Sequence, residues 1–240
     1  MQIENAVVLV TGANRGIGAE FVAQLKQRGA AKIYAASRAG DVAVDGVVPI
    51  RLDVTDPAQI QAAAAAAGDV QILINNAGIS TGTPVVSGDV AAIRREMDTN
   101  FYGPLLMTQA FAPVLAANGG GAIVNVASAL SWFTTPGSGA YAASKAAAWS
   151  LTDSTRLELA GQGTHVVAVH MGLVDTDMGA GAGADAPKIA PSTVAAAGLD
   201  AVESGLDEVL ADDWAKLVKS GLTLGPGERY ERIFSALSGS

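Results

Sequence analysis

"AVVLVTGANRGIG", residues 6–18, is the stretch that decides the fold of this 240-residue chain. An apolar, β-branched run leads directly into a turn with three glycines, Gly12, Gly16 and Gly18, and the turn opens a helical segment. Glycine is favoured there because a Cβ would resist the tight turn and block an approaching ligand. The backbone N–H groups of such a turn, together with the helix N-terminus, suit a nucleotide pyrophosphate. The alternative is a tight strand-to-helix turn without a ligand.

The rest of the chain repeats this alternation of short β-branched runs and longer helical stretches. Buried strands are predicted at 6–11, 32–37, 47–53, 70–75, 122–128 and 165–170. Helices are predicted near 16–28, 56–67, 88–117 and 138–161. Such alternation favours right-handed βαβ units, so we predict an α/β protein with one Rossmann-type, doubly wound parallel β-sheet and helices on both faces. No linker divides the sequence, and we expect one domain over 1–240.

Two later stretches depart from the pattern. "GAGAGADAP", at 179–187, is glycine-rich and too short for a domain, so it predicts a flexible substrate loop near 179–190. "DEVLAD", at 207–212, could form a last strand, and a helix is predicted near 213–220.

Composition narrows the function. The net charge is −8 without a basic cluster, which argues against a nucleic-acid partner or an anionic membrane surface. Cysteine is absent, so disulfides and thiolate chemistry are excluded. His165 and His170 share one apolar run and are expected to be strand residues rather than metal ligands. There is no targeting pattern and no long apolar run, so we predict a cytoplasmic protein with no membrane segment.

"YAASKAAA", at 141–148, places a phenol and an ammonium four residues apart among alanines. Alanine favours helix, and side chains at i and i+4 share one helix face. On its own the pair could be a surface lysine beside a half-buried tyrosine. The small residues around it suit either close approach of a cofactor and substrate or helix packing at a subunit interface.

Taken together, these motifs resemble the short-chain dehydrogenase/reductase family. The resemblance runs from residue 6 to about 178 and rests on the glycine turn, "NNAG" at 75–78, Asn100, Ser128, and Tyr141-x-x-x-Lys145. The family implies a Rossmann-type fold, a nicotinamide cofactor and carbonyl–alcohol interconversion by hydride transfer. We therefore expect reversible, NADPH-dependent reduction of a ketone or aldehyde. The alternative is a non-catalytic NADP-binding regulator or redox sensor of the same fold.

Four residues are the expected catalytic group. Tyr141 would protonate the substrate oxygen, and the Lys145 cation is expected to lower the pKa of the phenol. Ser128 would donate to the developing oxyanion. The resemblance gives Lys145 the nicotinamide ribose, and it gives Asn100 a water that relays protons. Pro104 has no N–H, so it either frees the Asn100 carbonyl for that water or simply kinks the helix.

The resemblance also implies where the cofactor lies. The expected cofactor-binding residues are Gly12, Asn14, Arg15, Gly16, Ile17, Gly18, Ser37, Arg38, Asp53, Val54, Asn76, Ala77, Gly78, Tyr141, Lys145, Gly172, Val174 and Thr176. Asp53 could instead be a helix cap or a turn residue. Met171-Gly172 replaces the Pro-Gly that is usual in the family.

Cofactor choice is predicted from the end of the second strand. Many NAD-using relatives carry an acidic residue there that binds the ribose 2′-hydroxyl. This sequence has Ser37 followed by Arg38, and Arg15 lies within the glycine turn. Two guanidinium groups suit a 2′-phosphate, so we predict NADP(H).

Substrate and assembly are less determined by the sequence. Leu130, Trp132 and Phe133 either line an apolar pocket or belong to the core. We expect a homo-oligomer, a dimer or a tetramer. The "DGG"-type ending that helps build tetramers in the family is missing, which weakens the case for the tetramer.

Overall fold

The structure, a computed structural model, describes residues 1–181 and 186–238. The middle of the predicted glycine-rich loop, 182–185, lies outside the described residues.

One parallel sheet contains the seven described strands, in the order β3-β2-β1-β4-β5-β6-β7. This confirms the predicted Rossmann-type, doubly wound sheet with helices on both faces. The "DEVLAD" stretch supplies the seventh strand, which pairs in parallel with the sixth. The strands are β1 (Val7–Thr11), β2 (Lys32–Ser37), β3 (Val48–Arg51), β4 (Ile72–Asn75), β5 (Gly121–Val126), β6 (Thr164–His170) and β7 (Glu208–Leu210).

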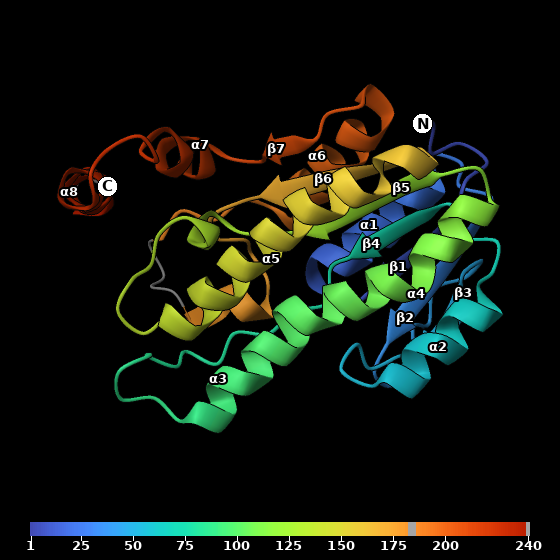
Figure 1. The fold of residues 1–240 in the computed structure, drawn as a ribbon, viewed down its shortest axis with the longest axis horizontal. Helices are drawn as coiled ribbons and strands as arrows, with labels where there is room; N and C mark the ends of the chain where they lie inside the picture. Colours follow the sequence, from blue (N-terminus) through green and yellow to red (C-terminus); the bar gives the residue numbers. More distant parts are fainter. Residues whose placement is uncertain (182–185, 239–240) are drawn as a thin grey trace.

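Helices cover both faces of this sheet (Figure 1). The α-helices are α1 (Gly16–Gln27), α2 (Pro57–Ala66), α3 (Val90–Met97), α4 (Gly103–Ala117), α5 (Gly139–Leu159), α6 (Pro191–Ser204), α7 (Asp213–Ser220) and α8 (Pro226–Ser238). The predicted helix over 88–117 is divided by a π-helical turn, Asp98–Tyr102. The sequence analysis did not predict α6 or α8.

The residues of β1 show why helices cover both faces of the sheet. Successive side chains of a strand point to opposite faces, so a strand buried on both sides reads as a continuous apolar run. Val8 and Val10 pack into the cluster that includes Phe21 of α1 and Val194 of α6. Leu9 packs on the other face with a cluster that includes Phe111 of α4.

The order of the strands fixes the place of a binding cleft. The chain winds outward from β1 to β3, then returns to β4 beside β1 and winds outward in the other direction. In such sheets, ligands bind beyond the carboxyl ends of the strands where the winding reverses. The glycine turn follows β1 at this edge, and the "NNAG" segment ends β4.

α7 and α8 follow β7 and lie beyond the carboxyl ends of the last strands (Figure 1). Trp132 and Phe133 are 5% and 7% exposed and form an apolar cluster with Ala215 and Val218 of α7 and Ile233 of α8. Both aromatic residues therefore belong to the core.

Candidate active site

The glycine turn has the conformation that its sequence predicts. Gly12 and Gly16 have φ of +64° and +54°, in the left-handed region that favours glycine. A Cβ on Gly18 would lie 2.1 Å from the carbonyl oxygen of Gly12. Only glycines allow the backbone to close this tightly, and the resulting cradle beside the start of α1 fits a dinucleotide phosphate.

A hydrogen-bond cluster ties the turn to the end of β4. The Thr11 hydroxyl accepts hydrogen bonds from the backbone N–H groups of Asn76 and Ala77, both at 3.0 Å. The Asn76 side chain donates to the carbonyls of Thr11 and Gly12, at 2.9 and 3.2 Å. The sequence analysis had not assigned a role to Thr11. Its signal was the hydroxyl residue directly before the first glycine.

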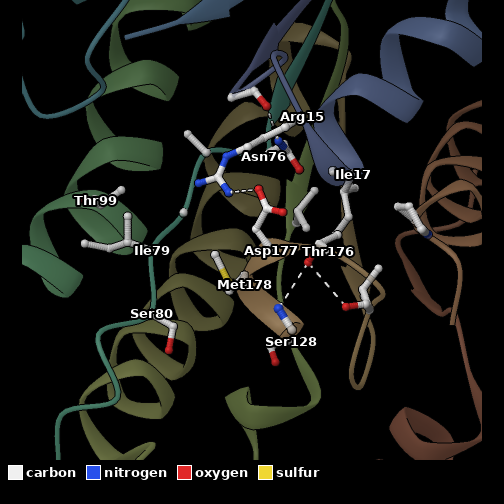
Figure 2. A pocket seen from close by; sticks show the side chains of 18 of the residues that line it. Arg15, Ile17, Asn76, Ile79, Ser80, Thr99, Ser128, Thr176, Asp177 and Met178 are labelled. Atoms are coloured by element: carbon white, nitrogen blue, oxygen red, sulfur yellow. Dashed lines mark hydrogen bonds and ion pairs between the residues drawn. The ribbon is translucent and has the colours of Figure 1, made fainter. Parts of the chain in front are cut away.

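A cleft of about 970 Å³ opens along this edge of the sheet and is shown in Figure 2. It gathers residues that are far apart in the sequence. The predicted site residues that line it are Gly12, Asn14, Arg15, Gly16, Ile17, Ser37, Arg38, Asp53, Val54, Asn76, Ala77, Gly78, Ser128, Tyr141, Lys145, Gly172, Val174 and Thr176. Two other predicted residues, Gly18 and Asn100, are buried behind the wall of the cleft. Leu130 lines the cleft, unlike the two aromatic residues that follow it.

Asp53 has a local role in the structure. Its carboxylate accepts hydrogen bonds from the backbone N–H and the hydroxyl of Thr55, at 2.9 and 2.7 Å. This supports the interpretation of Asp53 as a turn residue, although it also lines the cleft. A contact between Asp53 and the adenine stays a prediction.

Arg15 has a partner that the sequence did not reveal. Its guanidinium lies 2.6 Å from the carboxylate of Asp177, and the two side chains are 60% and 76% exposed (Figure 2). The pair connects the glycine turn to the segment after β6. Arg38 is exposed and has no ion pair with any residue in 1–181 or 186–238.

Tyr141 and Ser128 meet in the inner wall of the cleft, on α5 and directly beyond β5. Burial raises the pKa of Tyr141 to about 12, a hydrogen bond to Ser128 lowers it in part, and the negative charge of Glu96 raises it further. The expectation that Lys145 brings this pKa down is wrong for this structure. Burial dominates because it disfavours the phenolate.

Lys145 is buried one helical turn from the tyrosine. Its ammonium donates a 2.8 Å hydrogen bond to the carbonyl of Val126 and lies 5.7 Å from the centre of the Tyr141 ring. Burial lowers the pKa of Lys145 to about 8. Its titration midpoint therefore lies within about one pH unit of neutrality, which suits a group that exchanges protons.

Asn100 is fully buried and supports the site from behind. Its side-chain oxygen accepts from the backbone N–H of Ile79, and its amide donates to the Ile79 carbonyl, both at 2.9 Å. The amide also donates to the Ser144 hydroxyl, which donates in turn to the carbonyl of Tyr141. Asn100 thus connects the wall after β4 to the helix that carries the tyrosine. A water on the Asn100 carbonyl stays a prediction.

His170 lies beneath Ser128 and was expected only to be a strand residue. One ring nitrogen, Nδ1, is 3.1 Å from the Ser128 carbonyl, and the ring stacks on Trp132 with centroids 4.0 Å apart. Burial lowers the pKa of His170 to about 4, so the ring is neutral near pH 7. Among the described residues, no cluster of three or more His, Cys, Asp or Glu side chains could hold a metal ion.

Comparison with known proteins places these features in a family. The profile of the short chain dehydrogenase family matches residues 6–187. The chain belongs to the short-chain dehydrogenases. Members of this family are oxidoreductases, as the names of the similar proteins also indicate. None of the helices in the described part of the chain is both long and apolar enough to span a membrane.

Three similar proteins illustrate the relationship. A crystal structure of a short-chain dehydrogenase from Burkholderia cenocepacia in complex with NADP is 40% identical, with a TM-score of 0.91 over 97% of this chain and 99% of that one. NADPH-bound carbonyl reductase from chicken fatty liver is 28% identical, with a TM-score of 0.78 over 88% and 97% of the two chains. Dehydrogenase/reductase SDR family member 7B from Bos taurus is 30% identical over 94% of this chain and 79% of its own.

Proposed function

We propose that this short-chain dehydrogenase is an NADP(H)-dependent carbonyl reductase that interconverts a ketone or aldehyde and its alcohol. One observation carries the proposal. Tyr141, Ser128 and Lys145 line the same cleft as the glycine turn, so a proton donor and a phosphate cradle share one site.

The side chains suit protonation of a carbonyl oxygen. A bound nicotinamide would supply a hydride to the carbonyl carbon and thereby leave negative charge on the oxygen. With a pKa of about 12, Tyr141 is protonated at neutral pH and ready to donate to that oxygen. The Ser128 hydroxyl offers a second donor, in the manner of an oxyanion hole. Lys145 adds positive charge nearby and a proton that can be replaced.

NADP(H) is the proposed cofactor because of the charges at the outer end of the cleft. Ser37 ends β2 where an acidic residue would repel a 2′-phosphate, and Arg38 and Arg15 line the same end. The two similar structures from Burkholderia and chicken, which contain NADP and NADPH, support this choice.

Replacement of Tyr141 by phenylalanine tests the function. General-acid catalysis is worth about 10²–10⁴-fold, so turnover of the best ketone, followed by loss of NADPH absorbance, should fall by that factor. The affinity for NADPH and the melting temperature should stay close to those of the parent protein. If the Phe variant turns over within a few-fold of the parent, the proposed role of Tyr141 is wrong.

The same measurement separates the enzyme from a non-catalytic NADP-binding regulator. A regulator would bind NADPH but reduce no member of a broad ketone and aldehyde panel. The presence of Asn100, Ser128, Tyr141 and Lys145 in one connected site supports the enzyme.

A homo-oligomer is also proposed. Leu157 on α5 is 80% exposed, and Tyr102 at the end of the π-helical turn before α4 is 48% exposed. Association with a second copy would cover such apolar surface. Sedimentation velocity at several concentrations measures the assembly, and a monomer throughout would refute it.

A further inference from the structure

Ser80 stands out among the residues that line the cleft after β4. Its side chain lies toward the same end of the cleft as Ser128 (Figure 2). The Ser80 hydroxyl makes no hydrogen bond to any residue of the described chain, whereas the Ser128 hydroxyl accepts one from the N–H of Leu130. The apolar residues Ile79, Leu130 and Met178 also line the cleft.

The backbone on both sides of Ser80 is fixed by buried side chains. Asn100 binds both polar backbone groups of Ile79. On the other side, the Glu96 carboxylate accepts hydrogen bonds from the backbone N–H and the hydroxyl of Thr81. Glu96 and Asn100 are each 0% exposed. They are four residues apart, so their side chains lie on the same side of the helical segment.

This arrangement extends to the helix that carries the catalytic tyrosine. The hydroxyls of Thr81 and Thr83 lie 2.6 Å apart, and the Thr83 carbonyl accepts a hydrogen bond from the N–H of Ala140, the neighbour of Tyr141. The segment from Ile79 to Thr83 is therefore held at three points. Burial of a carboxylate such as that of Glu96 costs folding free energy unless the group is hydrogen-bonded. That a buried carboxylate holds the exposed Thr81 therefore calls for an explanation.

We propose that Ser80 is a specificity-determining residue that binds a neutral, hydrogen-bonding group on the substrate, such as a hydroxyl or a second carbonyl. Glu96 is the positioning residue that holds Ser80 in place through Thr81. A serine hydroxyl both donates and accepts but offers no charge to compensate an ionic group, so the contact favours a neutral substituent. This inference rests on the proposed carbonyl reductase function and names its substrate class, a carbonyl compound with a second polar group.

The test compares hydroxyalkyl methyl ketones with alkyl methyl ketones that have the same number of non-hydrogen atoms. For each pair, the preference is the ratio of kcat/KM for the hydroxylated ketone to kcat/KM for the alkyl ketone. We expect the parent to prefer at least one hydroxylated ketone and Ser80→Ala to reduce that preference by about two- to tenfold, as for one hydrogen bond. An unchanged preference in Ser80→Ala would overturn the proposal, and so would the absence of any preference in the parent.

Calorimetric titration of the same ketones into the protein loaded with NADP⁺ reads the contact without turnover. Failure of reduction alone would refute the proposed function, whereas equal binding of both ketone series would refute the Ser80 contact. The two failures are therefore distinguishable.

Variants of Glu96 test the positioning role. Glu96→Gln keeps an oxygen that can accept from Thr81, so it should keep the preference for the hydroxylated ketone. Glu96→Ala removes the acceptor and should reduce the preference through a higher KM. Thr81→Val, at an exposed position, removes one of the two donors and should show a smaller reduction even if Glu96→Ala does not fold. Parent-like preference in both Glu96→Ala and Thr81→Val, or in Thr81→Val alone where Glu96→Ala does not fold, would overturn the positioning role.

Discussion

Replacement of Arg38 by alanine should weaken NADPH binding about tenfold and change NADH binding by less than about twofold. A hydrogen bond between charged groups contributes about 1.5–3 kcal/mol, which corresponds to roughly ten- to 150-fold in affinity. Arg38 is exposed, and water and salt screen exposed charges, so the lower end of this range applies. NADH lacks the 2′-phosphate and therefore serves as the matched ligand.

Replacement of Asp177 should have the opposite effect on NADPH affinity. In the structure, Arg15 is paired with Asp177, so a 2′-phosphate would have to compete for this guanidinium. Pairs as exposed as this one contribute about 0–1 kcal/mol, which limits the competition to about fivefold in affinity. Asp177→Asn should therefore tighten NADPH binding by up to that factor, while Arg15→Ala should weaken it.

Fluorescence titration of both cofactors into the parent and the three variants measures these effects. Added salt should weaken NADPH binding more than NADH binding, because the extra contact is ionic. Equal affinity of the parent for NADPH and NADH would refute the assignment of the phosphate site. A loss of NADH affinity in Arg38→Ala as large as the loss for NADPH would show that the variant disturbs the fold of the cleft.

Three further predictions concern titration and packing. Because the pKa of Lys145 is about 8, kcat/KM for ketone reduction should fall as the pH rises above 8. The Lys145→Arg variant keeps its charge at high pH, so its kcat/KM should not show this fall. A parent profile that is flat from pH 6 to 10 would contradict the prediction. The pKa of His170 is about 4 in the folded protein and 6.5 in the unfolded chain. Between these pH values the unfolded chain binds more protons than the folded protein. The free energy of unfolding should therefore drop by about 3 kcal/mol as the pH falls from 7 to 4. Urea titrations would show this, and His170→Gln should show a smaller drop. Gly18→Ala should destabilise the protein by at least about 1–3 kcal/mol, because its Cβ would overlap a backbone carbonyl. Gly68→Ala is the control and should leave the stability unchanged, because Gly68 has open space around it. Equal unfolding midpoints for the two variants would refute the packing argument.

The fold could be predicted because buried parallel strands and the helices between them leave a strong pattern. The continuous apolar runs correspond to β1, β2, β4, β5 and β6 with small shifts at their ends. Two helices were not predicted, for different reasons. In α6 the signal was present, since Pro191 opens an alanine-rich stretch, but it follows the glycine-rich segment. In α8 the helix is stabilised partly by packing of Ile233 on Trp132 and Phe133, which no local pattern reveals.

The candidate site could be predicted as a set of positions, and its electrostatics could not. The order and spacing of the motifs along the chain were enough to predict that Ser128, Tyr141 and Lys145 lie in one cleft. The pKa of Tyr141 depends on how deeply the phenol is buried and on the Glu96 charge, and both are consequences of tertiary packing. The pairing of Arg15 with Asp177 joins residues 162 apart in the chain, so it leaves no signal in either local sequence.

A proline without a donor and a buried acid together explain how α3 and α4 serve the site. Pro104 cannot donate to the carbonyl of Asn100, and the next donor back, the N–H of Gly103, reaches the carbonyl of Asp98, five residues earlier. The helix widens there into a π-helical turn, a feature that often marks functional sites. Asn100 lies within the wide turn and Glu96 lies just before it, and both side chains are fully buried. The irregularity that interrupts a predicted helix thus lies where two buried polar side chains hold the wall of the cleft, which a regular helix with an exposed polar face would not provide.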